Sequence, residues 1–340
     1  MENSFVNKVR QSLIQHKINL LEWLQNEGRS KSIYFGLDGS GKESSGSLEI
    51  ISKIDTALNK MENGTFGKCA QCSEEVEVDR LILDFTTCVC LDHYTTEQKR
   101  ELESDLELAA KVQQYLLPRY LPSMKGMQMA VMSKPAGAVG GDYYDFFRYR
   151  NHGQGLAIAD VMGKGISAGM LMANLQASLR ILGPDFIELS ALTSRLNELF
   201  RYNLKQIRFI TLFLATFDPE TKEFSYCNAG HHPPLMWNAT SNSVYWLKPT
   251  GPAIGLAPEA KYTSGKLHLA DGDMLVLYTD GLVEARNNEQ TEFGFEKLEQ
   301  YTSGNAEKSP ESFINELMNQ FHQFGAKLRD DLTLMVLKLA

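Results

Sequence analysis

Four short strings place an aspartate at one edge of an apolar or aromatic run, in three cases with glycine nearby. They are VGGDYYDFF, GLAIADVMGKG, MLVLYTDG and DDLTLMVL, and their aspartates are Asp142, Asp160, Asp280 and the Asp330–Asp331 pair. Carboxylate oxygens are the ligands that hard divalent cations such as Mg²⁺ and Mn²⁺ prefer. Two such ions about 3.5–4 Å apart hold a phosphate and generate hydroxide between them. The four strings together therefore indicate a two-metal site that hydrolyses phosphate esters.

Each aspartate taken alone is more typical of a turn, where its side chain bonds the neighbouring backbone. The combination favours a metal site, because glycine beside a ligand lets backbone and water approach a metal with no Cβ in the way. We expect Asp145 to be a structural hydrogen-bond acceptor and Asp331 to be a carboxylate of a turn or of the N-terminal end of a strand, and both are left out of the metal site.

Four of the five cysteines are crowded together. Cys69 and Cys72 form a C-x2-C pair, and Cys90 and His93 form a later C-x2-H pair. Three thiolates and one imidazole at this spacing suit tetrahedral Zn²⁺. Cys88 leaves alternatives open: it replaces His93, or the cluster is a metal-free, redox-active set of thiols. The fifth, Cys227, is expected to be a buried apolar residue.

Helices are expected on both sides of the cysteine cluster. Apolar spacing predicts them over 5–27 and 47–62, and again over 97–117 up to Pro118. The last helix has a seam at alternating four- and three-residue steps: Leu102, Leu106, Ala109, Gln113 and Leu116. The seam is too short to distinguish a coiled coil from packing against the domain's own body.

The character of the sequence changes near residue 126. Short apolar or alternating runs, several joined by hairpin-length turns such as DPETK, predict antiparallel strands. Helices are expected at 165–182, 187–204, 294–302 and 310–325. Strand meanders with helices between them predict an α+β fold, a β-sandwich covered by helices.

Six strings, in this order, resemble the bacterial SpoIIE/RsbU-type phosphatases: LELAAKVQQYLLP, VGGDYYDFF, IADVMGKGISAGMLMA, NAGHHPPL, LYTDGLVEA and DDLTLMVL. That group belongs to the metal-dependent, type-2C (PPM) serine/threonine phosphatase superfamily. The resemblance covers about residues 104–340 and implies a four-layer α/β/β/α sandwich.

The resemblance also implies a ligand set. Asp142, Asp160, Asp280 and Asp330 match the aspartates that bind two Mn²⁺ or Mg²⁺ ions in the family, with Asp160 bridging the ions and the Val161 carbonyl as a further ligand. The implied reaction is direct attack of a metal-activated water on phosphorus, without a covalent phosphoenzyme.

The chain departs from the eukaryotic branch of the superfamily, since no clear counterpart of its phosphate-binding arginine precedes Asp142. Lys164 either contacts phosphate or caps the following helix. The NAGHHPP string, with His231 and His232, is expected to form a packed turn, and neither histidine is assigned as a general acid.

The string MENGTFGKCAQC and the cysteine spacing resemble the DksA/TraR-type zinc finger, with His93 where that family usually has a fourth cysteine. The resemblance implies one structural Zn²⁺ held by Cys69, Cys72, Cys90 and His93, in a finger over about 64–96. In those relatives the finger accompanies a helical hairpin that docks on RNA polymerase, and the helices at 5–27 and 47–62 match that hairpin only weakly.

A near-match to the phosphate loop lies at GLDGSGKE, Gly36 to Glu43. Glu43 replaces the Ser or Thr whose hydroxyl binds Mg²⁺ in that loop, so we expect a flexible loop and no nucleotide site.

Composition bounds the class of protein. With 43% hydrophobic and 22% charged residues, the 340-residue chain is typical of a soluble globular protein. A formal charge of −8 and no Lys/Arg block predict no direct binding of nucleic acid. No apolar run of about 18 residues or signal-peptide core is found, so no membrane span and a cytoplasmic location are expected.

The sequence therefore predicts three parts: a helical region with the finger over 1–96, a linker helix over 97–120 and a phosphatase domain over 121–340. The expected function is metal-dependent hydrolysis of phosphoserine or phosphothreonine, regulated by the N-terminal module. The expected substrate is a phosphorylated signalling partner of the STAS-type anti-sigma-factor antagonist class, and a homodimer through the linker helix is left open. The alternative is a catalytically inactive scaffold, or a regulator that binds RNA polymerase through the finger; the intact aspartates argue against it.

Overall fold

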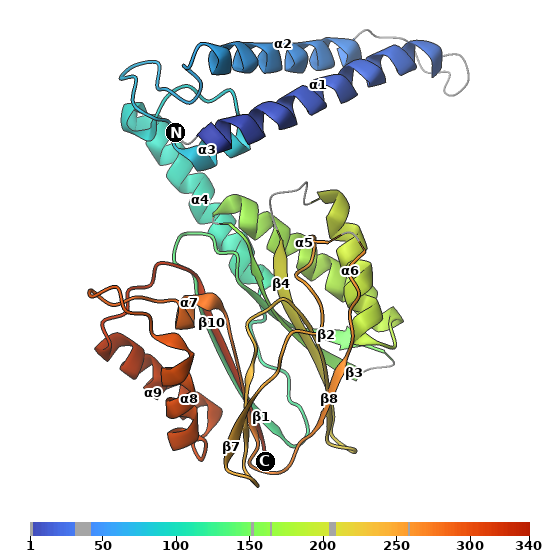
Figure 1. Ribbon diagram of the computed structural model, residues 1–340, viewed down its shortest axis with the longest axis vertical. Helices are drawn as coiled ribbons and strands as arrows, with labels where there is room; N and C mark the ends of the chain where they lie inside the picture. The colour runs from blue at the N-terminus through green and yellow to red at the C-terminus, as the bar shows by residue number, and fades with distance from the viewer. Residues whose placement is uncertain (1–2, 31–41, 151–152, 164, 204–208, 258) are drawn as a thin grey trace. The chain divides into compact units, whose positions relative to one another are not determined.

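The computed structural model describes residues 3–30, 42–150, 153–163, 165–203, 209–257 and 259–340 (Figure 1). The chain divides into two compact units, Met1–Glu103 and Ser104–Ala340, and each is described by itself. The phosphate-loop near-match lies almost entirely outside the described residues, as does Lys164. Within the described part of the chain, no helix is both long enough and apolar enough to cross a membrane.

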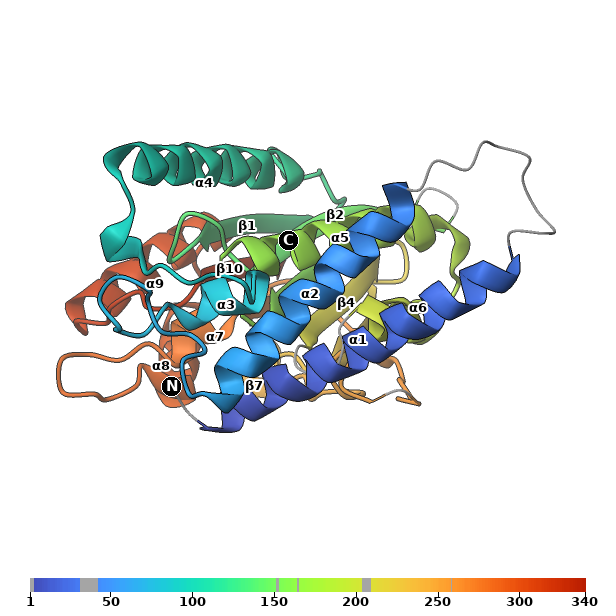
Figure 2. The ribbon, with the colours of Figure 1, turned by 90° about the horizontal axis from the view of Figure 1, so that it is seen from above.

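The first unit is built on two helices, α1 (Asn3–Ser30) and α2 (Lys42–Glu62), which lie side by side (Figure 2). Their apolar positions recur at helical spacing, so Leu13 of α1 and Ile54 and Ala57 of α2 are buried in one cluster. The cluster continues into the cysteine-bearing segment, with the short helices α3 (Val78–Leu83) and η1 (Leu91–His93).

Helix α4 (Thr96–Leu116) begins in the first unit and ends in the second. It starts with a capping box, in which the backbone N–H of Gln98 donates to Thr95 Oγ1 (3.2 Å) and the backbone N–H of Thr95 donates to Gln98 Oε1 (3.0 Å). At its C-terminal end, Leu116 and Leu117 pack against the core of the second unit. Of the two alternatives for the predicted seam, this end of the helix therefore packs on the domain's own body.

The second unit contains two antiparallel sheets. The first has the strand order β1-β10-β9-β6-β7 and the second has the order β2-β3-β4-β5-β8. The strands of the first sheet are Met127–Lys134 (β1), Leu332–Leu339 (β10), Met274–Tyr278 (β9), Leu235–Asn238 (β6) and Ser243–Trp246 (β7). Those of the second are Tyr143–Tyr149 (β2), Gly153–Val161 (β3), Ile210–Asp218 (β4), Glu223–Ala229 (β5) and Gly265–His268 (β8).

Helices cover the outer face of each sheet (Figure 1). Helices α5 (Ile166–Leu182) and α6 (Leu189–Asn203) share a core with the second sheet. Helices α8 (Gly294–Asn305) and α9 (Pro310–Gln323) share a core with the first. A third core fills the space between the sheets. The result is a four-layer α/β/β/α sandwich, which confirms the predicted α+β class for this unit.

Alternation along the strands explains the long apolar runs. Successive side chains of a strand point to opposite faces, so Leu334 and Val336 of β10 enter the core under α8 and α9, while Met335 and Leu337 enter the core between the sheets. Because both faces are covered, the LTLMVLKL string has no need of polar positions over most of its length.

Candidate functional site

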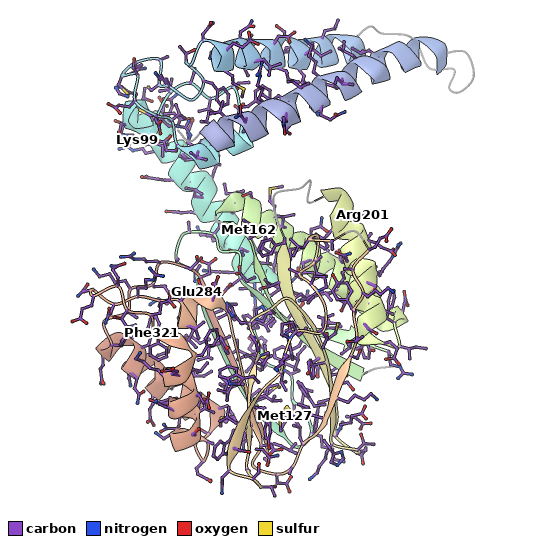
Figure 3. All side chains as sticks on the ribbon, in the orientation of Figure 1. Lys99, Met127, Met162, Arg201, Glu284 and Phe321 are labelled. Atoms are coloured by element: carbon purple, nitrogen blue, oxygen red, sulfur yellow. The ribbon has the colours of Figure 1, made fainter. Side chains whose placement is uncertain are left out.

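The predicted carboxylates gather at one end of the sandwich. Asp142 directly precedes β2, Asp160 lies at the end of β3, Asp280 opens the short helix α7 (Asp280–Val283) after β9, and Asp330 lies two residues before β10. Since β2 pairs antiparallel with β3 and β9 with β10, the start of one strand lies beside the end of its neighbour. Figure 3 shows Met162 and Glu284, which follow Asp160 and Asp280, at the end of the unit opposite Met127.

A cavity of about 530 Å³ opens at this end. Its lining includes Asp160, Val161, Asp280 and Asp330, together with His231 and His232. The structure thus brings three of the four predicted aspartates to one cavity, and Asp142 lies close enough for the Asp160 carboxylate to affect its pKa.

The carboxylates perturb one another. Burial, followed by the negative charges of Asp280 and Asp330, raises the pKa of Asp160 to about 7. Burial, followed by the charge of Asp160, raises the pKa of Asp142 well above its usual range, although a hydrogen bond from Thr279 Oγ1 to Asp142 Oδ2 (2.7 Å) opposes the rise. Asp142 Oδ1 is buried and has no hydrogen-bond partner among the described residues. A group of neighbouring carboxylates, one of them buried with an oxygen that has no hydrogen-bond partner among the described residues, is a donor set that suits divalent cations.

Two glycines of the site, Gly141 and Gly281, allow a close approach of backbone segments that the sequence did not predict. A Cβ on Gly141 would lie 2.8 Å from the Val161 carbonyl oxygen, and one on Gly281 would lie 2.0 Å from the Asp331 carbonyl oxygen. Both distances are too short for any side chain. The glycines therefore let the strand ends that carry the aspartates approach one another, whereas the sequence suggested that they admit metal and water.

Asp331 does more than the role expected of it, that of a carboxylate in a turn or at the N-terminal end of a strand. Its carboxylate accepts hydrogen bonds from the backbone N–H groups of Ala136 (2.7 Å) and Gly141 (2.5 Å), which belong to the loop between β1 and β2. Asp331 therefore fixes the loop that presents Asp142. The adjacent DD pair is visible in the sequence, but partners 190 and 195 residues away are not.

Asp145 is a structural acceptor, as expected. It is buried and accepts hydrogen bonds from Arg180 Nε (2.9 Å), from the Tyr143 hydroxyl (2.8 Å) and from the backbone N–H of Phe146 (2.8 Å). These bonds connect β2 to α5 on the outer face of the sheet.

The two histidines differ in their surroundings. His231 is buried, its Nδ1 lies 2.9 Å from Thr211 Oγ1, and its backbone N–H donates to Asn228 Oδ1 (2.8 Å). Burial lowers the pKa of His231 to about 3. His232 is partly exposed, with Nε2 3.8 Å from Glu284 Oε1, and burial lowers its pKa as well. The packed turn expected for NAGHHPP agrees with the position of His231.

The cysteine–histidine cluster forms a separate group within the first unit. Possible ligand atoms of Cys69, Cys72, Cys90 and His93 all lie within 4.8 Å of one another, and Cys88 is not part of the group. Cys72 Sγ lies 3.8 Å from Cys90 Sγ, and His93 Nδ1 lies 3.1 Å from Cys90 Sγ and 3.9 Å from Cys69 Sγ. The backbone N–H of Cys90 lowers the pKa of Cys69 to about 6. Cys227, far along the chain, is a buried side chain of β5, as expected.

A family model and a characterised relative both match this chain in sequence. The family model described as Stage II sporulation protein E (SpoIIE) matches residues 150–340. The phosphoserine phosphatase RsbU of Bacillus subtilis (strain 168) is 32% identical over 247 residues, which are 71% of this chain and 71% of RsbU.

Two solved structures resemble the fold. The PP2C domain of SiaA from Pseudomonas aeruginosa superimposes with a TM-score of 0.62 at 20% identity and covers 71% of this chain and 98% of its own. RsbX in complex with magnesium gives a TM-score of 0.50 at 16% identity and covers 65% of this chain and 99% of its own.

Proposed function

The chain belongs to the SpoIIE family of protein serine/threonine phosphatases, and from that premise we propose that it hydrolyses phosphoserine or phosphothreonine on a protein partner with the help of two Mn²⁺ or Mg²⁺ ions. The observation that carries the proposal is the convergence of the Asp160, Asp280 and Asp330 carboxylates on one cavity, where burial, followed by the charges of Asp280 and Asp330, raises the pKa of Asp160 to about 7.

The ligands in this proposal are the carboxylates of Asp142, Asp160, Asp280 and Asp330 and the carbonyl oxygen of Val161. The unpartnered Oδ1 of Asp142 supports the assignment, as does the magnesium in the RsbX complex, a protein of similar fold. When bound, such ions lower the pKa of a coordinated water and offset negative charge on phosphoryl oxygens.

The chain's own residues hold the carboxylates in place. Thr279 donates to Asp142 and accepts a hydrogen bond from the backbone N–H of Thr333 (2.8 Å), so Asp142 is oriented by the ends of β9 and β10. Asp331 fixes the loop before Asp142. His231, with a pKa of about 3, is neutral near pH 7 and supplies no proton there.

The proposal is tested by the hydrolysis of p-nitrophenyl phosphate and of a phosphoserine peptide, with Mn²⁺ or with chelator. We expect turnover that requires metal and falls at least about 100-fold in Asp280→Asn, because the variant loses a charged ligand. Asp271→Asn, at an exposed carboxylate on the second unit, is the matched control and should keep full turnover. Turnover indifferent to both metal and Asp280 would exclude the two-metal mechanism, and no turnover at all would favour the scaffold alternative.

The natural substrate we propose is a phosphorylated STAS-type anti-sigma-factor antagonist, encountered in the cytoplasm and without direct contact to nucleic acid. The support is the resemblance of the six strings and the similarity to RsbU. A homodimer through α4 belongs to the same proposal, supported by the exposed side chains of Leu108, Val112 and Tyr115 at four- and three-residue steps on that helix.

We also propose that Cys69, Cys72, Cys90 and His93 hold one structural Zn²⁺ in a finger over about 64–96, through which the N-terminal module regulates the phosphatase. Tetrahedral zinc with bonds of about 2.3 Å to sulfur and 2.0–2.1 Å to nitrogen separates two sulfurs by about 3.8 Å and sulfur from nitrogen by about 3.6 Å. The distances of 3.8 Å between Cys72 and Cys90, and of 3.1 and 3.9 Å to His93, lie around these values.

Metal content of the purified protein tests the zinc proposal. We expect about one zinc per chain by mass spectrometry, lost in Cys72→Ser and kept in Cys88→Ser, because Cys88 lies outside the group of ligand atoms. Equal zinc content in the two variants, or none in the wild type, would contradict it.

A further inference from the structure

The loop that presents Asp142 is held by a side chain from α4. In this loop, between β1 and β2, the backbone N–H of Gly140 donates to Gln113 Oε1 (3.0 Å) and the carbonyl of Gly140 accepts from Gln113 Nε2 (2.6 Å). One carboxamide therefore satisfies both backbone groups of a single glycine. The next N–H, of Gly141, goes to Asp331. The two backbone units before Asp142 are thus fixed by side chains from opposite ends of the catalytic unit's sequence.

The position of Gln113 is itself well defined. It lies in the last turn of α4, where Leu116 and Leu117 pack into the core under α5. Gln176, a buried residue of α5, donates to the carbonyl oxygen of Leu116. A Cβ on Gly169 of α5 would lie 2.4 Å from Val139 Cγ1 and 3.5 Å from Gln113 Nε2, so α5 closes tightly over the same loop.

We propose that Gln113 is a positioning residue of the proposed metal site, which raises the affinity of that site for divalent cations by holding Gly140 in place. The inference rests on the proposed function. Gln113 touches no predicted ligand; it acts through Gly140 on Asp142, two residues further along the chain. Without the carboxamide, both backbone groups of Gly140 lose their partner, and the loop gains freedom at the point where the Asp142 carboxylate must meet Asp160.

The position of Gln113 on α4 makes this contact sensitive to the helix as a whole. One residue along an α-helix turns through about 100°. A rotation of α4 by one residue would remove the carboxamide from Gly140, and Gln114, which is exposed, shows that the next position does not face the loop.

The test compares Gln113→Ala with Gln114→Ala, which removes the same side chain from the adjacent, exposed position. Binding of Mn²⁺ to the full-length protein is measured by titration calorimetry, and kcat is measured as a function of Mn²⁺ concentration. We expect Gln113→Ala to weaken Mn²⁺ binding and raise the Mn²⁺ concentration for half-maximal turnover by about 10-fold or more, with kcat at saturating Mn²⁺ within about 3-fold of wild type. Gln114→Ala should match wild type in Mn²⁺ affinity, in the Mn²⁺ concentration for half-maximal turnover and in kcat.

A graded variant separates positioning from general stability. Gln113→Glu keeps an acceptor for the Gly140 N–H and loses the donor to the Gly140 carbonyl, so its Mn²⁺ affinity should lie between those of wild type and Gln113→Ala. Equal Mn²⁺ affinity in Gln113→Ala and Gln114→Ala overturns the inference, as does a lower unfolding temperature in Gln113→Ala with unchanged affinity.

Asp280→Asn distinguishes this failure from failure of the proposed function. If wild type binds Mn²⁺, Asp280→Asn does not and Gln113→Ala binds normally, the metal site stands and the role of Gln113 is wrong. If wild type and Asp280→Asn bind Mn²⁺ equally weakly, both proposals are wrong.

Discussion

At the scale of single residues, Thr279 forms hydrogen bonds with two other parts of the candidate site: Asp142, which precedes β2, and Thr333 of β10. Its hydroxyl donates to Asp142 Oδ2 (2.7 Å) and accepts from the backbone N–H of Thr333 (2.8 Å). An ionised carboxylate only accepts hydrogen bonds, so the one hydrogen of the Thr279 hydroxyl is directed to Asp142. The bond from Thr279 therefore occupies Asp142 Oδ2, and the buried Oδ1 is the oxygen left without a hydrogen-bond partner among the described residues.

His231 gives a prediction about pH at this scale. Burial lowers its folded pKa to about 3, whereas the unfolded chain protonates it near its usual value of about 6.5. Its contribution to the free energy of unfolding is therefore fully present above about pH 6.5 and is lost as the pH falls toward 3. Urea unfolding at pH 7.0 and 5.5 should show a decrease for wild type that is smaller in His231→Gln, by up to about 1.4 kcal/mol per pH unit.

The matching measurement is the NMR titration of the His231 ring. Its signals should not shift between pH 8 and 5. A midpoint near pH 6.5 would contradict the burial of this residue beside Thr211 and Asn228.

At the scale of elements, the site depends on strand ends that approach more closely than side chains allow. Gly141 lies against the end of β3 at the Val161 carbonyl, and Gly281 of α7 lies against the backbone before β10. Asp331 and Gln113 then bond the loop between β1 and β2 from two sides. The carboxylates are therefore positioned by backbone contacts between elements more than by contacts between the carboxylates' own side chains.

Gly281→Ala tests this dependence. The new Cβ would lie 2.0 Å from the Asp331 carbonyl oxygen, so the backbone must move, and we expect a loss of about 1–3 kcal/mol in the free energy of unfolding together with a loss of turnover. Gly304→Ala is the matched control: it lies in α8, its new methyl group would have no described atom within 4 Å, and it should be neutral or slightly stabilising. Chemical denaturation of both variants gives the comparison, and equal stability would exclude the close approach.

Sequence patterns predict the aspartates and the helices of this unit, and they do not predict the hydrogen bonds that position the aspartates, for a physical reason. Asp142, Asp160 and Asp280 can be placed at strand ends because alternation and glycine are local signals. The elements α5, α6, α8 and α9 are likewise predicted close to their observed ranges. The bonds of Gln113 to Gly140 and of Asp331 to Ala136 join side chains to backbone atoms, so no complementary residue type marks their partners in the sequence. The sequence pattern therefore assigns Gln113 only to a helical seam.

At the scale of the whole molecule, α4 belongs to both units, since it begins with the capping box at Thr95 and ends beside the core under α5. Each unit has its own buried core, and that of the first includes Cys69 and Cys90 of the proposed zinc site. The proposed regulation therefore needs no surface between the units: one continuous helix joins the module with the cysteine cluster to the loop that carries Asp142.

The central place of β10 has a consequence for the synthesis of the protein. This strand pairs with both β1 and β9 and follows them in the sequence, and Asp330 and Asp331 immediately precede it. A chain still emerging from the ribosome has made β1 to β9 but lacks the strand that joins β1 to the rest of the first sheet. Until β10 leaves the exit tunnel, the loop before Asp142 has no Asp331 to bond and the carboxylate cluster has no Asp330. A nascent chain therefore carries no assembled candidate site, and we expect a protein truncated before Asp330 to lack phosphatase activity.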